Sequence, residues 1–265
     1  MFIERTGTGP RTFLGLHGWS GDHRTFLPVT AKLPEDVSFF SADLPGCGAS
    51  PPPRQWTLSS VADSVAEAIW MLPPPVTIVG NCSGALLGLQ AAQRAASRVN
   101  RMVLIDMLAV FPWYFRVFLS RPIGPYAYAT TFRNPLGRWF TNLSLRGKRD
   151  RQTTLTGGFA RVDHAVIYKY LQLFEEYPQP ESFQDLNQPI ELLHGEKTFQ
   201  AIRDSVNRWK SVWPQATATC LKGAGHLPIQ EATAQLRGIL YYAGKVTTKC
   251  REENVKQFHW ASRTD

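Results

Sequence analysis

Six short apolar runs, each bounded by turn-forming residues, alternate along this chain with segments whose apolar residues recur at helical spacing. The runs lie at Thr12–Leu16, Val37–Ala42, Val76–Val79, Met102–Ile105, Ile190–Leu193 and Ala218–Leu221. This alternation is typical of a mostly parallel sheet with helices on both faces. The chain has 265 residues, of which 43% are hydrophobic, so it is long enough to bury one substantial core. We therefore expect one large α/β unit.

Three segments between or after these runs are expected to be helices. Leu58–Leu72 carries apolar residues on one face, and Ser60 with Asp63 resembles a capping box at its start. The residues after Ser83 are small, which allows a helix there to pack closely against the sheet. A last helix is expected from about Ile229 to Ala243.

The fourth and fifth runs are separated by many more residues than an ordinary crossover needs. We expect residues 107–185 to form an inserted helical cap on a core made by residues 1–106 and 186–244, with a polar tail at 245–265. Residues 107–174 hold ten Lys and Arg against two Asp, and 14 of the 31 aromatic residues. Residues 107–174 therefore carry a net charge of +8, equal to that of the whole chain, so the basicity is local.

Composition and the first residues exclude several classes of protein. Met1–Pro10 lacks the basic and apolar pattern of a signal peptide, and the apolar stretch Met107–Leu119 is interrupted by Pro112 and Arg116 and too short to span a bilayer. The four cysteines show neither a zinc-binding nor a disulfide pattern, which favours reduced thiols in a cytoplasmic protein. No nucleotide-binding or nucleic-acid-binding motif is present, and the histidines lack metal-ligand spacing. We expect no cofactor, no metal and no nucleic-acid partner.

The segment Gly80-Asn81-Cys82-Ser83-Gly84 follows the third apolar run and precedes an expected helix. A tight turn between strand and helix needs small residues on both sides, and it lifts its central side chain above the carboxyl end of the sheet. Cys82 occupies that central position.

Four motifs in this order resemble the α/β-hydrolase family. They are Leu16-His17-Gly18-Trp19, Asp43-Leu44-Pro45-Gly46-Cys47-Gly48-Ala49-Ser50, the Cys82 turn and Gly223-Ala224-Gly225-His226. The resemblance covers about residues 10–243 apart from the cap, and it implies an α/β-hydrolase fold with Cys82 as nucleophile and His226 as base. Most members have serine at this turn. Cysteine there is similar to dienelactone hydrolases and polyhydroxyalkanoate synthases.

A cysteine nucleophile suits acyl transfer. A thiol with an unperturbed pKa of roughly 8.5 is readily converted to thiolate beside an imidazole and a helix N-terminus. The alternatives are that Cys82 is an inert small residue in a turn that has lost its function, or an introduced replacement for serine.

The acid that orients His226 departs from the family pattern. Thr198 stands where the resemblance places an aspartate, and its hydroxyl cannot replace a carboxylate. Asp106, directly after the fourth run, is the favoured substitute, as in some haloalkane dehalogenases. Glu196 and Asp204 are weaker alternatives, and a dyad without any acid is also open because a thiol needs less help from a base than an alcohol does.

Developing negative charge on a substrate oxygen needs two fixed donors. The resemblance assigns them to the backbone N–H groups of Trp19 and Ser83, with the Trp19 ring as an alternative pocket wall. Asn81, Phe111 and Trp113 are candidates for the substrate pocket, although aromatic residues in a cap are equally often core.

The function expected from these features is acyl transfer through an acyl-Cys82 intermediate, and the expected substrate is an acyl thioester of coenzyme A or of an acyl carrier protein. Hydrolysis, transfer and cyclisation stay open, because they differ only in the acceptor. The rivals are a lactone or ester hydrolase of the dienelactone type and a non-catalytic binding protein. The sequence gives no indication of the oligomeric state.

Overall fold

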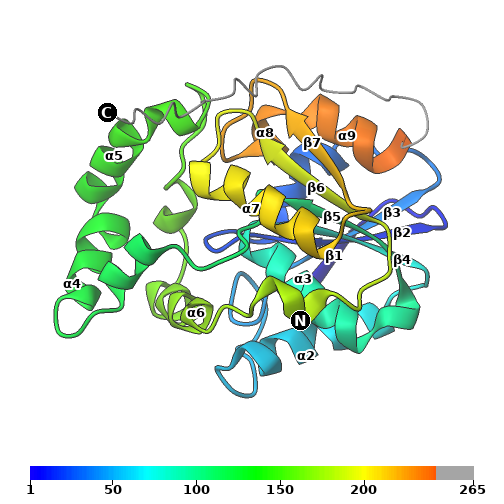
Figure 1. Cartoon of the computed structure of the whole chain (residues 1–265), viewed down its shortest axis with the longest axis horizontal. Coiled ribbons are helices and arrows are strands. Elements are labelled where there is room, and N and C mark those ends of the chain that lie inside the picture. The colour runs from blue at the N-terminus through cyan, green and yellow to red at the C-terminus, as the bar shows by residue number, and fades with distance from the viewer. Residues whose placement is uncertain (243–265) are drawn as a thin grey trace, which may run out of the picture.

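The computed structural model describes residues 1–242; the tail expected at 245–265 and the last residue of the expected final helix, Ala243, lie outside the described residues (Figure 1). Its strands form one seven-stranded sheet in the order β1-β3-β2-β4-β5-β6-β7. They are β1 (Ile3–Thr6), β2 (Arg11–Leu16), β3 (Val37–Ala42), β4 (Val76–Asn81), β5 (Val99–Ile105), β6 (Ile190–Gly195) and β7 (Thr217–Leu221). Every pair of neighbours is parallel except β1 with β3. The expected mostly parallel sheet is confirmed.

Strand β1 was not expected from the sequence. Its four residues, Ile-Glu-Arg-Thr, contain no apolar run, and none of them is fully buried. The strand forms because its backbone pairs antiparallel with the exposed edge of β3, from Ile3 opposite Ala42 to Thr6 opposite Phe39. Pairing at a sheet edge depends on backbone groups rather than on side-chain pattern.

Helices cover both faces of the sheet, as expected. One face carries α1 (Leu27–Thr30), α8 (Pro228–Glu231) and α9 (Thr233–Tyr242), and the other carries α2 (Leu58–Met71), α3 (Ser83–Arg94) and α7 (Gln200–Val212). In Figure 1, α8 and α9 lie above the sheet, and α2 and α3 lie below it. The fold therefore has three layers.

Two details of the helices differ from the prediction. The capping box at Ser60 is wrong, because α2 begins at Leu58 and the Thr57 side chain accepts from the Ser60 N–H. Asp63 instead pairs with Arg94 of α3, at 2.6 Å between Oδ1 and Nε. The single final helix is also wrong: the backbone leaves helical geometry at Ala232 (φ −128°, ψ 36°), which separates α8 from α9.

Between β5 and β6 the chain forms α4 (Gly124–Tyr128), α5 (Pro135–Ser144) and α6 (His164–Glu175), with several shorter turns. In Figure 1 these green helices lie to the left of the sheet. Many of their aromatic rings pack on one another and on Trp19, whose indole N–H also donates to the Ile167 carbonyl at 2.8 Å. Part of the aromatic content of this segment is therefore its own core. We call residues 107–185 the cap, and its status as a separate domain stays a prediction.

Among residues 1–242, no helix is both long enough and apolar enough to cross a bilayer.

Candidate active site

The turn between β4 and α3 holds Cys82 in a strained backbone conformation. Cys82 has φ 50° and ψ −116°, and its N–H donates to the Ile105 carbonyl of the next strand at 2.7 Å. A Cβ atom on Gly80 would lie 2.4 Å from the Ala85 Cα, and one on Gly84 would lie 2.3 Å from the Leu16 oxygen. Only glycine fits on either side. The turn thus presents a partly exposed thiol at the N-terminal end of α3.

Asp106 directly follows β5, and like Cys82 it has a positive φ, at 49°. Its side chain is fully buried, so its charge requires hydrogen-bond partners. Oδ1 accepts from the Gly195 N–H at 2.9 Å, and Oδ2 accepts from the Thr198 hydroxyl at 2.7 Å and lies 2.8 Å from Nδ1 of His226. These contacts fix the carboxylate at the carboxyl edge of the sheet.

Thr198 is part of this cluster, although the sequence predicts no role for it. Its buried hydroxyl donates to Asp106 and lies 3.3 Å from Nδ1 of His226. The two other candidate acids lie elsewhere in the network: Glu196 accepts from the Gly223 N–H, and Asp204 accepts from Gln200. The only sequence signal for Thr198 was its place after β6, where the resemblance to the α/β-hydrolase family puts an acid.

His226 follows β7 and contacts both Asp106 and Cys82. Because Asp106 occupies Nδ1, the ring presents Nε2 to the thiol. Burial lowers the pKa of His226, but hydrogen bonds and charge interactions with Asp106 and Cys82 outweigh it and raise the pKa from 6.5 to about 10. The raised pKa of His226 therefore favours an imidazolium at neutral pH.

The loop after β2 passes beside the thiol. A Cβ atom on Gly18 would lie 3.3 Å from that of Cys82, and Trp19 follows directly. Ser83 is the first residue of α3, so its N–H has no partner within that helix. His17 stabilises this loop: its buried ring bonds the Gly18 carbonyl through Nδ1 and accepts from the Leu44 N–H through Nε2, and burial lowers its pKa.

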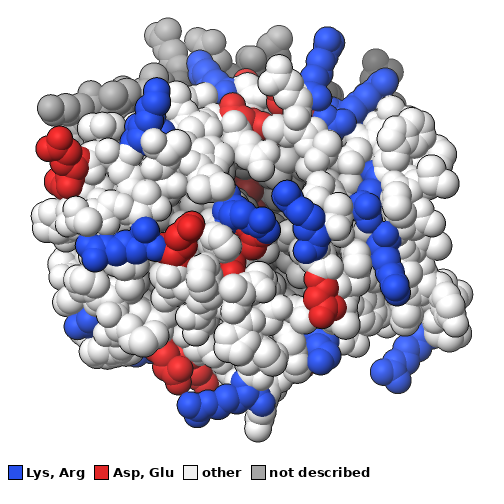
Figure 2. Space-filling model, turned by 180° about the vertical axis from the view of Figure 1, so that it is seen from behind, with Lys and Arg blue, Asp and Glu red and all other residues white. Residues whose placement is uncertain are grey.

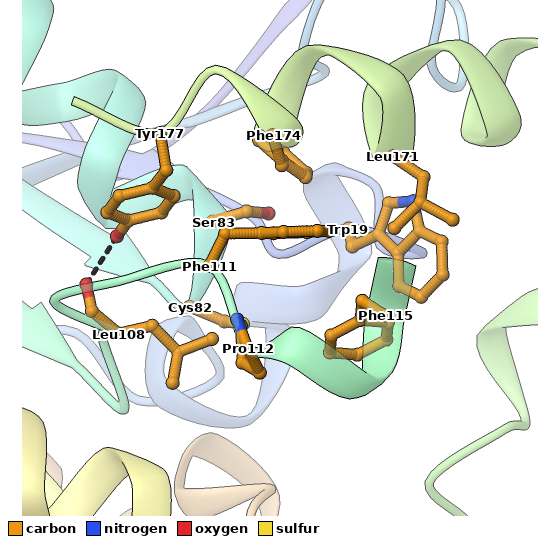
Figure 3. A pocket seen from close by; sticks show the side chains of 10 residues that line it. All are labelled: Trp19, Cys82, Ser83, Leu108, Phe111, Pro112, Phe115, Leu171, Phe174 and Tyr177. Carbon is orange, nitrogen blue, oxygen red and sulfur yellow. Dashed lines mark hydrogen bonds between the residues drawn. The ribbon is translucent and has the colours of Figure 1, made fainter. Parts of the chain in front are cut away.

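An apolar cavity of about 60 Å³ opens beside Cys82 (Figure 3). Its wall consists of Trp19, Cys82, Ser83, Leu108, Phe111, Pro112, Phe115, Leu171, Phe174 and Tyr177. Figure 3 shows the Phe111 ring extending toward Trp19. Of the residues expected in a pocket, Phe111 is in this wall, whereas Asn81 is not, and Trp113 is 75% exposed and also absent from it.

The cavity residues contributed by α6 and the turn after it were not predicted from the sequence. Leu171 and Phe174 have the spacing of ordinary core residues, so nothing in the sequence separates them from the rest of the helix. The Tyr177 hydroxyl donates to the Leu108 carbonyl, as the dashed line in Figure 3 marks. Burial, and then the neighbouring Cys82, raise the pKa of Tyr177, which keeps it a hydrogen-bond donor.

The cap is tied to the loop that carries His226. The His226 N–H donates to the Lys148 carbonyl at 2.8 Å. One carboxylate, that of Glu231, accepts from the Gly225 N–H through Oε2 and from the Asp150 N–H and the Thr153 hydroxyl through Oε1. Glu231 thus joins the base-bearing loop to cap residues 150–153.

We expect Glu231→Gln to lower kcat/KM by roughly tenfold. The amide nitrogen of glutamine would face an N–H or O–H donor, so the hydrogen bonds on one side of this link would be lost. Glu196→Gln is the matched control: Glu196 accepts from Gly223 in the same loop but does not contact the cap. Steady-state kinetics of both variants measure the difference. Equal effects of the two substitutions would contradict a special role for the link.

The comparisons with known proteins agree with this architecture. The model of the alpha/beta hydrolase family matches residues 13–237. A pimeloyl-[acyl-carrier protein] methyl ester esterase of Nitrosomonas europaea is 24% identical over 86% of this chain and 93% of its own length. One from Methylococcus capsulatus is 35% identical, but the match spans only 40% of each chain.

Solved structures show the same fold. A bromoperoxidase from Bacillus anthracis superposes with a TM-score of 0.72 at 15% identity, covering 90% of this chain and 92% of that one. A hydrolase from Oleispira antarctica gives a TM-score of 0.69 at 16% identity, covering 91% and 93%. With the family match over most of its length, this chain belongs to the α/β-hydrolase family.

Proposed function

We propose that the protein hydrolyses an acyl ester through an acyl-Cys82 intermediate, with His226 as general acid and base and Asp106 as the residue that orients it. The observation that carries the proposal is the continuous contact from the thiol through the imidazole to a buried carboxylate, beside an apolar cavity. A non-catalytic protein has no need to bury a carboxylate against a histidine at a strained turn.

The first half of the proposed reaction forms the acyl-enzyme. The sulfur of Cys82, whose proton resides on Nε2 of His226, attacks the ester carbonyl carbon. The N–H groups of Trp19 and Ser83 stabilise the resulting oxyanion. The intermediate then expels the alkoxide, which takes the proton from His226 and leaves as the alcohol.

The second half returns Cys82 to the state in which its proton resides on Nε2 of His226. His226 removes a proton from water, the hydroxide attacks the thioester carbonyl, and the sulfur leaves as the carboxylic acid is released. Asp106 stabilises the imidazolium in both halves and keeps its Nδ1 hydrogen directed at the carboxylate.

The relatives suggest the substrate class. They are pimeloyl-[acyl-carrier protein] methyl ester esterases. A cavity of about 60 Å³ corresponds to roughly four to six water positions. It accommodates a small ester group and a few carbons, so a longer chain has to leave the cavity past the cap.

A carrier-linked substrate also fits the charge of the cap. Arg146, Arg149, Arg151 and Lys197 surround a surface hollow that includes Asp150. Lys148, between the first two arginines, contacts the His226 loop through its carbonyl. On the face that Figure 2 shows, Lys and Arg side chains are interspersed with Asp and Glu. We propose that this hollow attracts an anionic carrier or its phosphate group.

Thioester cleavage is the second candidate, favoured by the sulfur nucleophile itself, and lactones are the third substrate class to test. The enzyme should be incubated with methyl esters, acyl thioesters and lactones, followed by intact-protein mass spectrometry. We expect an acyl adduct with methyl esters that maps to Cys82. Cys47 is an internal control, because burial raises its pKa to about 12. Turnover of thioesters alone would support the second candidate, and absence of both adduct and turnover would overturn the proposal.

The pH dependence tests the role of His226. Its raised pKa means that the imidazolium is present below about pH 10 and lost above it. We expect kcat/KM of the wild-type enzyme to fall as the pH rises through about 10, because the leaving alkoxide then lacks its proton donor. In Asp106→Asn, which removes the main interaction that raises this pKa, the fall should move to lower pH. An unchanged alkaline limb in that variant would contradict the proposed pairing.

A further inference from the structure

Helix α5 of the cap directs its apolar face outward. Leu136, Trp139, Phe140 and Leu143 follow the i, i+3, i+4, i+7 pattern of one helix face. Their exposed fractions are 68%, 57%, 61% and 45%. No residue of this ten-residue helix is buried. An amphipathic helix in a globular protein normally directs such a face into the core.

The polar side of α5 contacts the rest of the cap. Asn142 exchanges hydrogen bonds with Thr156, which is itself buried, and the Thr156 hydroxyl donates to the Arg138 carbonyl. A Cβ atom on Gly137 would lie 1.7 Å from the Thr130 oxygen, so the helix backbone lies directly against the preceding turn. The outward direction of the apolar face is therefore set by packing, and α5 lies at the outer edge of the molecule (Figure 1).

The charged residues closest to this face in the sequence are basic. Residues 107–149 contain seven Lys and Arg and neither Asp nor Glu. Exposed arginines stand close to both ends of α5, Arg133 before it and Arg146 after it. Further apolar side chains, including Ile123 and Tyr126, are exposed on α4 and the turn before it, in the same cap.

The charge and the exposed apolar side chains of this surface distinguish among the partners that it could bind. A symmetric contact with a second copy would bring two predominantly basic surfaces together. Residues 243–265 of the chain carry five Lys and Arg against three Asp and Glu, so they do not offer charge complementarity either. Exposed Trp, Phe and Leu side chains flanked by arginines match instead the interface of an anionic lipid bilayer.

We propose that the outward face of α5, with Arg133 and Arg146, docks the cap on an anionic membrane surface. Trp139 and Phe140 enter the region between headgroups and acyl chains, and the arginines pair with lipid phosphates. The apolar face of α5 lines neither the cavity nor the basic hollow, and only Arg146 is shared with that hollow. The inference therefore does not require the proposed function.

The test is co-sedimentation of the full chain with vesicles of phosphatidylcholine alone and with vesicles in which about a third of the lipid is phosphatidylglycerol. We expect binding to the anionic vesicles that weakens at high salt, and a loss of about tenfold or more in the double variant Trp139→Ser/Phe140→Ser. The matched control is Trp70→Ser/Met71→Ser, an adjacent pair on α2 with exposed fractions of 53% and 68%, which should bind like wild type.

Circular dichroism and thermal unfolding verify that both double variants are folded. Absence of binding to anionic vesicles overturns the proposal, as does equal binding by both double variants. In a third outcome, the wild-type protein binds no vesicles, while Trp139→Ser/Phe140→Ser loses self-association in sedimentation velocity or binding to an acidic carrier protein. That result would overturn the proposal and assign the face to the protein contact.

Discussion

Replacement of Cys82 by alanine is expected to lower kcat/KM for a methyl ester by about 10⁴-fold or more, because it removes the nucleophile that contacts His226 beside the cavity. The remaining rate would come from binding and from the two backbone donors. The fold should survive, since the thiol is partly exposed and alanine is compatible with a small-residue turn, although the positive φ of 50° stays strained. Steady-state kinetics and mass spectrometry on the same samples measure the rate and the adduct together.

Cys82→Ser is the informative companion variant. It keeps a nucleophile of similar size next to His226, so it should retain more activity than Cys82→Ala. An adduct that persists in Cys82→Ala would place the nucleophile elsewhere. Wild-type turnover in that variant would remove covalent catalysis by Cys82 from the mechanism.

Asp106→Asn is expected to lower kcat by about 10²- to 10⁴-fold. The two carboxylate oxygens accept from Gly195, Thr198 and His226. If the asparagine oxygen keeps the bond to Gly195, its amide group faces Nδ1 of His226 as a donor. The imidazole then carries its hydrogen on Nε2, which can no longer accept a proton from the thiol. Kinetics combined with thermal unfolding separate this effect from loss of stability.

Thr198→Val is the matched control for Asp106→Asn. It removes one hydrogen bond to the same carboxylate oxygen at nearly constant volume, while the charge and the bond to His226 persist. We expect a loss of roughly tenfold, well short of that in Asp106→Asn. If Asp106→Asn is no worse than Thr198→Val, Asp106 supports the structure without orienting the base.

Local patterns in the sequence were sufficient for the sheet and for the turn at Cys82. The buried parallel strands are near-continuous apolar runs, which are visible without knowledge of their neighbours. The glycines around Cys82 are required by close backbone contacts that any chain with this turn must make. The residues that meet at the site all follow strands, so their position at one edge of the sheet followed from the strand order.

Edge and cap features depended on partners distant in the chain. Strand β1 exists only because β3 offers it an unpaired edge. Composition likewise did not fix the helix boundary at Ala232. Nor did it determine that Thr57, rather than Ser60, caps the start of α2. The direction of α5 is the clearest case: its sequence has one apolar face, and only its contacts through Asn142 and Gly137 decide that this face points away from the core.

The sequence by itself determined the fold class and the place of Cys82 in a tight turn, because these follow from short-range periodicity and from steric limits. The resemblance of its motifs to the α/β-hydrolase family supplied the candidates His226 and Asp106. Only the tertiary structure decided which carboxylate faces His226, that Thr198 holds that carboxylate, and that Glu231 joins the His226 loop to the cap. Each of these is a hydrogen bond between residues brought together by different loops. Such contacts depend on distances in space, which spacing along the chain does not encode.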